Sequence, residues 1–159
     1  MVTIEVNIST QLLSVMKEEK VAAIYQVSTA KNGVGELYGS EKTPRGWHVI
    51  RAKIGHDCVE NTIFKARRPT GEIYSPALKQ IYPQRDWILT RILWLSGLEV
   101  GKNRLYQVDT MRRYIYIHGA PPESKMGIPG SKGCIRMENK ALIELFNMVS
   151  VGTKLLIVE

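Results

Sequence analysis

The stretch at residues 114–137 reads YIYIHGAPPESKMGIPGSKGCIRM. Aromatic and β-branched residues over 114–118 predict a strand, which Gly119 closes. Three prolines then predict a loop over residues 120–132, and a cysteine follows directly after a glycine. A strand, a long loop and a reactive side chain in this order indicate a β scaffold whose loops build a site.

The rest of the chain extends this β pattern and ends with one change of period. From Asn139, the expected N-cap, apolar residues recur at helical spacing and predict a helix over about residues 139–150. Residues 56–83, broken by three prolines, predict mostly loop and short strands. A second long loop is expected over residues 31–46. Further strands are predicted at residues 2–8, 11–16, 21–27, 47–54, 87–95 and 155–158.

Length and composition indicate one globular domain over residues 1–159. The chain is 44% hydrophobic and 23% charged, and no apolar run approaches the roughly 18 residues of a membrane span. Its formal net charge of +7 favours an acidic partner, such as nucleic acid, anionic lipid or an anionic cell-wall polymer. The charge alone does not choose among these partners.

Cys134 occupies the position expected of a nucleophile. It follows a Pro/Gly-rich loop and precedes a helix, where backbone N–H groups can converge on a developing oxyanion. His118 ends the preceding strand, and the loop between them can fold back, so imidazole and thiol can meet as base and nucleophile. A neighbouring imidazolium and N–H dipoles are then expected to lower the thiol pKa. The alternatives are a buried structural cysteine and a strand-end histidine bonded to backbone.

Metal and nucleotide sites are poorly supported by the spacing of candidate residues. The chain has no CxxC, HExxH or HxxxH pair, so we expect no metal and no cofactor. The possible zinc ligands are His48, His56, Cys58, His118 and Cys134. Of these, His56 and Cys58 are more simply loop or core residues. The glycines at Gly33 and Gly35 lack the rest of a dinucleotide fingerprint.

Two basic clusters are not expected to bind nucleic acid. Neighbouring residues of a strand point to opposite faces, so the clusters, Lys65/Arg67/Arg68 and Arg112/Arg113, are more simply a solvated rim. Arg136 differs, because in an extended backbone it shares a side with Cys134. There it can fix loop geometry or pair with a substrate carboxylate.

Three ordered motifs resemble one known family over nearly the whole chain. GSEKTPRG at residues 39–46, IHG at 117–119 and SKGCIRM at 131–137 are similar to the YkuD-type L,D-transpeptidase catalytic domain of bacterial cell-wall synthesis. The resemblance implies a mostly β, sandwich-like fold with a late helix and long site-forming loops. It also implies a cysteine nucleophile.

The resemblance further implies a reaction on peptidoglycan stem tetrapeptides, both as donors and as acceptors. The thiolate of Cys134 releases the terminal D-alanine, and the thioester passes to an amine to give a 3→3 cross-link. His118 is then the base, the Gly119 carbonyl orients its ring, and the N–H groups of Gly133 and Cys134 form the oxyanion hole. Ser131, Lys132 and Arg136 take the substrate-binding positions of the motif.

Lys132 is the one departure from the family motif, which usually has histidine there. An ammonium group can favour the thiolate, but it cannot accept a proton as neutral imidazole does. We therefore expect an altered pH dependence. Two other readings remain open, an L,D-carboxypeptidase that uses the same site and a non-catalytic basic binding module.

The family implies a periplasmic or cell-wall location. The first residues carry neither a basic n-region nor an apolar h-region, so no export signal is visible. Either the protein works where it is made, or this chain was cut from a longer precursor. A cytoplasmic location is the alternative, in which the protein would meet only precursors or recycled fragments. The sequence does not indicate an oligomeric state.

Overall fold

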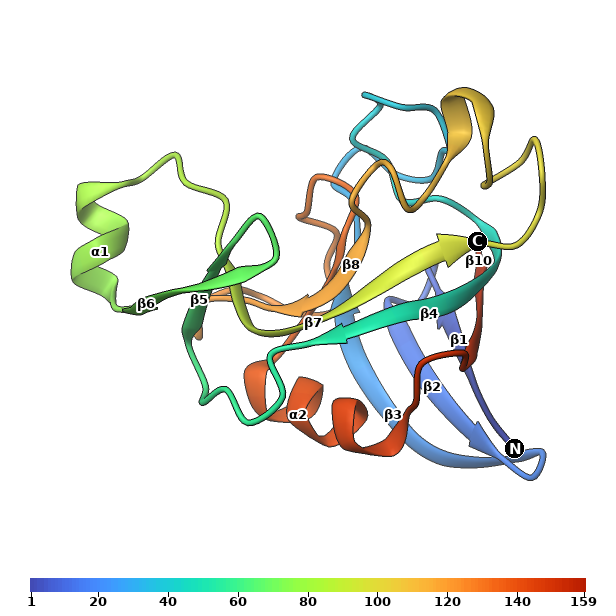
Figure 1. Cartoon of the computed structure of the whole chain (residues 1–159), viewed down its shortest axis with the longest axis horizontal. Coiled ribbons are helices and arrows are strands. Elements are labelled where there is room, and N and C mark those ends of the chain that lie inside the picture. Colours follow the sequence, from blue (N-terminus) through green and yellow to red (C-terminus); the bar gives the residue numbers. More distant parts are fainter.

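One ten-stranded sheet dominates the fold. The computed structural model describes residues 1–159, and its strands run in the order β4-β10-β1-β2-β3-β9-β8-β7-β5-β6. A further pairing of β4 with β7 joins the first strand to the eighth, so the sheet closes into a barrel-like form (Figure 1). The strands are β1 Val2–Asn7, β2 Leu12–Lys17, β3 Lys20–Ser28, β4 Gly46–Ile54, β5 Thr62–Lys65, β6 Arg68–Ile73, β7 Ile88–Gly97, β8 Tyr116–Gly119, β9 Ile135–Met137 and β10 Lys154–Val158. The predicted mostly β fold is confirmed.

The late helix, α2 (Asn139–Met148), packs its apolar stripe against this sheet. Leu142, Leu145 and Phe146 are fully buried in an 18-residue core cluster shared with the strands. Burying each such side chain contributes about 2 kcal/mol. Figure 1 shows α2 lying below the strands that carry the site. The predicted late helix is therefore confirmed, and it covers one side of the core.

The beginning of α2 differs from the prediction. Asn139 is the first helical residue and Glu138 is the N-cap, without a side-chain cap bond. The Asn139 side chain is instead buried: its amide donates to the Ala120 carbonyl at 3.1 Å, and its oxygen accepts from the Thr90 hydroxyl at 2.7 Å. The expected N-cap is thus wrong, because Asn139 serves tertiary contacts behind the end of β8.

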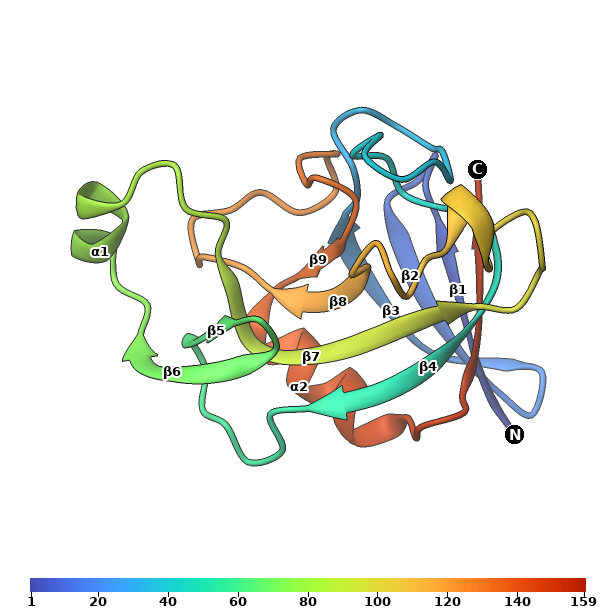
Figure 2. The same cartoon turned by 45° about the horizontal axis from the view of Figure 1, so that its top comes forward.

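Residues 56–83 contain a helix that the sequence did not indicate. Helix α1 (Pro76–Ile81) begins with Pro76, whose fixed φ and missing N–H suit a first helical position. The Ser75 hydroxyl accepts from the Leu78 N–H at 3.3 Å and caps it. Together with β5 and β6, α1 forms an arm beside the barrel (Figure 2). The prolines predicted only interruption, whereas one of them starts the helix.

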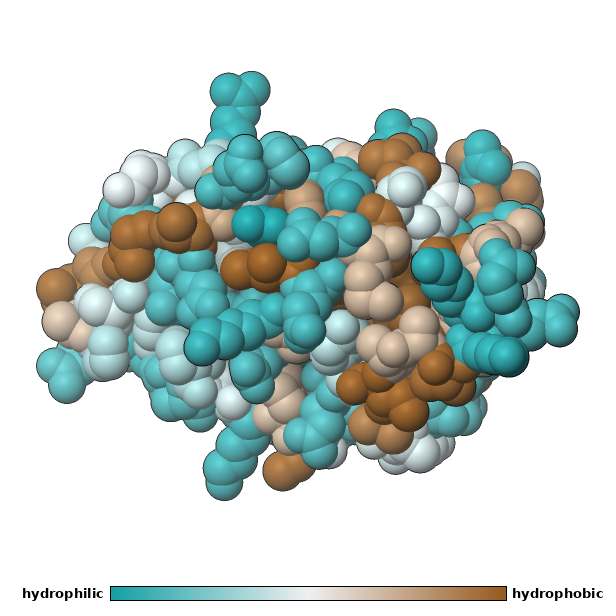
Figure 3. Space-filling view, turned by 90° about the horizontal axis from the view of Figure 1, so that it is seen from below, coloured by the Kyte–Doolittle hydropathy of each residue, from teal (hydrophilic) through white to brown (hydrophobic).

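The surface carries both hydrophilic and apolar side chains. Figure 3 shows one face on which apolar areas are separated by hydrophilic side chains. Val21 and Ile24 of β3 are among the large apolar side chains that are more than half exposed. No helix is both long and apolar enough to cross a membrane.

Candidate active site

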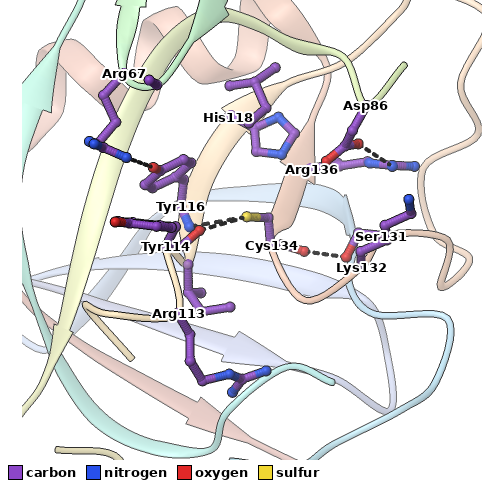
Figure 4. Close-up of a pocket in the computed structure, with 13 residues that line it drawn as sticks. Arg67, Asp86, Arg113, Tyr114, Tyr116, His118, Ser131, Lys132, Cys134 and Arg136 are labelled. Atoms are coloured by element: carbon purple, nitrogen blue, oxygen red, sulfur yellow. Dashed lines mark hydrogen bonds and ion pairs between the residues drawn. The ribbon is translucent and has the colours of Figure 1, made fainter. Parts of the chain in front are cut away.

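The parallel pair β8–β9 brings the predicted nucleophile and base to one cavity. Ile117 lies opposite Ile135 and His118 opposite Arg136, and both isoleucines point into the core. Since side chains alternate along a strand, His118 and Arg136 point to the other face, where Cys134 also lies. All three line a cavity of about 470 Å³. Figure 4 shows the His118 ring and the Cys134 sulfur facing the same space.

The His118 ring is held in one orientation and one tautomer. Its Nδ1 lies 2.6 Å from the Gly119 carbonyl oxygen, which can only accept, so Nδ1 carries the proton. Nε2 is left as the ring nitrogen that can accept a proton. Burial lowers the pKa of His118 below its ordinary value, and the Gly119 carbonyl opposes this effect. The neutral ring is therefore the resting form at neutral pH.

The Cys134 thiol is neutral in the resting structure. Burial raises its pKa to about 12, although the Tyr116 N–H, which donates to Sγ at 3.3 Å, favours the thiolate. The thiol itself donates to the Tyr114 carbonyl at 3.4 Å. The expected lowering of the thiol pKa is wrong for this state, because burial outweighs the nearby N–H and cationic groups. The site holds two neutral groups and no preformed thiolate–imidazolium pair.

The turn before Cys134 is braced by Ser131. Its hydroxyl donates to the Cys134 carbonyl at 2.5 Å and accepts from the Gly133 N–H at 3.1 Å. The Gly133 N–H is thus engaged in the resting structure, and its place in a pair of oxyanion donors stays a prediction. The Cys134 N–H donates no hydrogen bond within the chain. Only this member of the predicted pair is free to bind an oxyanion.

Charged groups surround the mouth of the cavity. Arg136 donates to the Gly130 carbonyl at 3.1 Å and pairs with Asp86 at 3.4 Å, while Lys132 is exposed at the rim. Asp86 had no sequence signal, since it lies in an irregular segment before β7. The ion pair holds Arg136 beside Cys134, where its charge favours the thiolate against the opposing effect of Asp86.

Two arginines expected on a solvated rim belong to the site region. The Arg113 guanidinium is partly buried and donates to the carbonyls of Gly35, Glu36 and Lys42, the last at 2.6 Å. Arg67 lies 4.5 Å from the centroid of the Tyr114 ring and donates to the Tyr116 hydroxyl at 3.1 Å. The prediction of a solvated rim is therefore wrong for Arg67 and Arg113. A cluster of charges in the sequence does not show which basic side chains are enclosed by tertiary contacts.

The remaining candidate metal ligands are His48, His56 and Cys58. No group of three or more His, Cys, Asp or Glu is placed to hold a metal ion. His48 is fully buried, with Nδ1 at 2.9 Å from the Gly46 carbonyl and Nε2 at 2.9 Å from the Thr110 hydroxyl. His56 is exposed, and Cys58 packs against a small apolar cluster.

A thiol, an oriented imidazole and a free N–H around one cavity are the groups that acyl transfer by a cysteine uses. The family model of the YkuD L,D-transpeptidase catalytic domain matches residues 1–157, and the chain belongs to this family. The family-level prediction is confirmed, and the chain is an enzyme of this family by fold and sequence.

Two relatives from Bacillus subtilis (strain 168) carry the same family name. The L,D-transpeptidase-family protein YqjB is 28% identical over 154 residues, which are 97% of this chain and 69% of YqjB. The corresponding protein YkuD is 40% identical over 52 residues, 33% of this chain and 32% of YkuD.

Solved structures show the same fold. An L,D-transpeptidase from Mycobacterium smegmatis matches 99% of this chain with a TM-score of 0.60 and 19% identity. L,D-transpeptidase 3 from Mycobacterium tuberculosis, in complex with a faropenem-derived adduct, matches 99% with a TM-score of 0.60 and 15% identity. This chain spans 58% and 60% of those two chains, so the likeness concerns their shared domain.

Proposed function

We propose that residues 1–159 form a single catalytic domain that transfers peptidoglycan stem tetrapeptides through a thioester on Cys134. The observation that carries this proposal is the placement of Cys134 and His118 at one cavity by the β8–β9 pair, with the His118 ring fixed by Gly119. The family of the chain supplies the substrate class.

Acylation begins with two neutral groups. Because burial raises the thiol pKa to about 12, the thiolate is a minor form at neutral pH. His118 Nε2 therefore takes the thiol proton as sulfur attacks the carbonyl carbon before the terminal D-alanine. The Cys134 N–H binds the oxyanion, the C–N bond breaks, and His118 returns the proton to the leaving amine.

The second half of the reaction reverses these steps with a new nucleophile. An amine of a second stem attacks the thioester, His118 accepts its proton, and the sulfur leaves and is protonated again. The product with an amine is a 3→3 cross-link. The same thioester attacked by water gives L,D-carboxypeptidase activity, and analysis of the released products separates the two.

The basic cavity mouth suits an acidic donor. Arg67, Lys132 and Arg136 line the cavity, and Asp86 is the one carboxylate among its lining residues. Arginine binds carboxylates through paired N–H donors. We therefore assign Arg136 and Lys132 to carboxylates of the stem peptide, and Ser131 to the turn that holds Cys134.

The test is intact-protein mass spectrometry with a disaccharide-tetrapeptide and with a penem. We expect a covalent mass gain on the reduced protein that is absent in Cys134→Ala, with Cys58→Ala as the matched control that keeps the gain. A folded protein without an adduct from either reagent would contradict the proposal. It would favour the binding module, whose affinity should fall steeply with salt.

The family indicates work at the cell wall, so we also propose a periplasmic or wall location. Fractionation of cells that express the native gene, followed by detection of this chain, tests it. Recovery with the cytoplasm alone would favour trimming of recycled muropeptides over cross-linking.

A further inference from the structure

A threonine from the distant 31–46 loop is bonded to the peptide unit that precedes the nucleophile. The Thr43 side chain is fully buried, and its hydroxyl donates to the Gly133 carbonyl at 2.9 Å. The same oxygen accepts from the Ala30 N–H at 2.9 Å. Because a hydroxyl has a single proton, these two bonds fix its direction without ambiguity.

This bond determines where the Cys134 N–H points. The chain has no cis peptide bonds, so the C=O of Gly133 and the N–H of Cys134 point in opposite directions across one planar unit. The carbonyl is directed at Thr43, and the N–H is therefore directed away from the 31–46 loop. It is also the N–H of this turn that has no partner within the chain, while that of Gly133 is taken by Ser131.

The surroundings keep the peptide unit in this orientation. Gly133 has φ +127°, a conformation that side-chain-bearing residues rarely adopt. A Cβ there would lie 3.1 Å from Ile115 and 3.2 Å from the Lys42 carbonyl, which Arg113 holds in turn. The loop at residues 31–46 is thus bonded to the cysteine turn through Thr43, and the Lys42 carbonyl leaves no room for a side chain at Gly133.

We propose that Thr43 is a positioning residue for acyl transfer, whose hydroxyl holds the Gly133 carbonyl and thereby aims the Cys134 N–H at the substrate oxyanion. This inference rests on the proposed function. Thr43 does not touch the substrate. It acts through the peptide unit that it orients.

The test compares two reactions of Cys134 in Thr43→Val and Thr43→Ser. Acylation by p-nitrophenyl acetate or tetrapeptide passes through an oxyanion, whereas alkylation by iodoacetamide forms a C–S bond, expels iodide and passes through none. Misplacing an oxyanion donor costs roughly 100-fold in rate. We expect Thr43→Val to lose acylation by about this factor with alkylation unchanged. Thr43→Ser, which keeps the hydroxyl, should restore most of the acylation rate.

A second measurement needs no variant. With ¹⁵N-cysteine labelling only Cys58 and Cys134 give amide signals, and Cys58 already donates to the Gly55 carbonyl at 2.9 Å. On forming a hemithioacetal with a peptide aldehyde, the Cys134 amide proton should move downfield while that of Cys58 stays. An unmoved Cys134 signal in the adduct, or equal losses of acylation and alkylation in Thr43→Val, overturns the inference.

The outcomes also separate this inference from the proposed function. A wild-type protein acylated by the ester but not by the tetrapeptide refutes the proposed substrate and leaves Thr43 testable with the ester. A wild-type protein acylated by neither refutes both.

Discussion

Lowering the pH should destabilise the protein through His48, which does not line the cavity. The ring lies fully buried on β4, between the Gly46 carbonyl and the Thr110 hydroxyl. Burial lowers its pKa from 6.5 to about 4, against the raising effects of the Gly46 carbonyl and Glu99. Between these two values the unfolded chain binds a proton that the folded protein does not, so stability is lost as the pH falls.

The magnitude follows from the two pKa values. One pKa unit corresponds to about 1.4 kcal/mol, so the full difference of about 2.5 units amounts to about 3.5 kcal/mol. Applying the linkage relation between about pH 7 and pH 5 gives a loss of about 2 kcal/mol in the free energy of unfolding from His48 alone. That is a large part of the roughly 5–15 kcal/mol by which domains are stable.

Urea unfolding at a series of pH values measures this loss. Burial also lowers the pKa of His118, so the quantity to compare is the difference between wild type and His48→Gln. The variant should be less stable near neutral pH and should lack about 2 kcal/mol of the acid-induced loss. His56→Gln, which changes an exposed ring, is the matched control and should follow the wild type. Parallel pH curves for wild type and His48→Gln would refute the reasoning.

Three further predictions concern the site and its support. Because burial lowers the pKa of His118, the acylation rate should stay high as the pH falls to about 6.5 and should decline only at lower pH. Stopped-flow kinetics in which the acylation rate already falls above pH 6.5 would contradict this prediction. Lys132→His replaces the lysine charge at the rim by an imidazole charge that is lost above about pH 6.5. The pH–rate profile of this variant should therefore differ from that of the wild type. An unchanged profile would count against an electrostatic role for Lys132. Asn139→Ala leaves the Ala120 carbonyl without its donor and should lower the free energy of unfolding by about 1–3 kcal/mol. Glu138→Ala changes an N-cap that makes no side-chain bond and should not lower it. Equal urea midpoints for the two variants would refute the tertiary role of Asn139.

The sequence predicts most of the β scaffold because its strands alternate clearly. The alternation in residues 2–8 and 21–27 matches β1 and β3, and the helical period after Asn139 matches α2. Helix α1 was not predicted because it is only six residues long. Its N-cap serine and first-turn proline are a weaker signal than the other prolines of this segment, which indicate a loop. How the ends of the sheet meet, β4 against β7, depends on register over long sequence distances, which local periodicity does not encode.

In the candidate site too, local motifs are predictable from the sequence and tertiary contacts are not. Cys134, His118 and Gly119 stand in short motifs, so the sequence identifies them, and the structure brings them together. The roles of Asp86 and Arg113 depend on tertiary contacts at 50 and more than 70 positions' separation, and no local pattern marks either residue. The raised thiol pKa is likewise a consequence of burial, which motif reading does not supply.

The parallel pairing of β8 with β9 also has a consequence for how this chain acquires its chemistry. Two short strands separated by a proline-containing crossover come together only after a long loop has closed, a slow kind of event in folding. Until then the cysteine and histidine are independent side chains with ordinary reactivity. The selective reaction of Cys134 with an acyl donor would therefore report that this strand pair has formed, and a collapsed but unpaired chain would show only the ordinary reactivity of a free thiol.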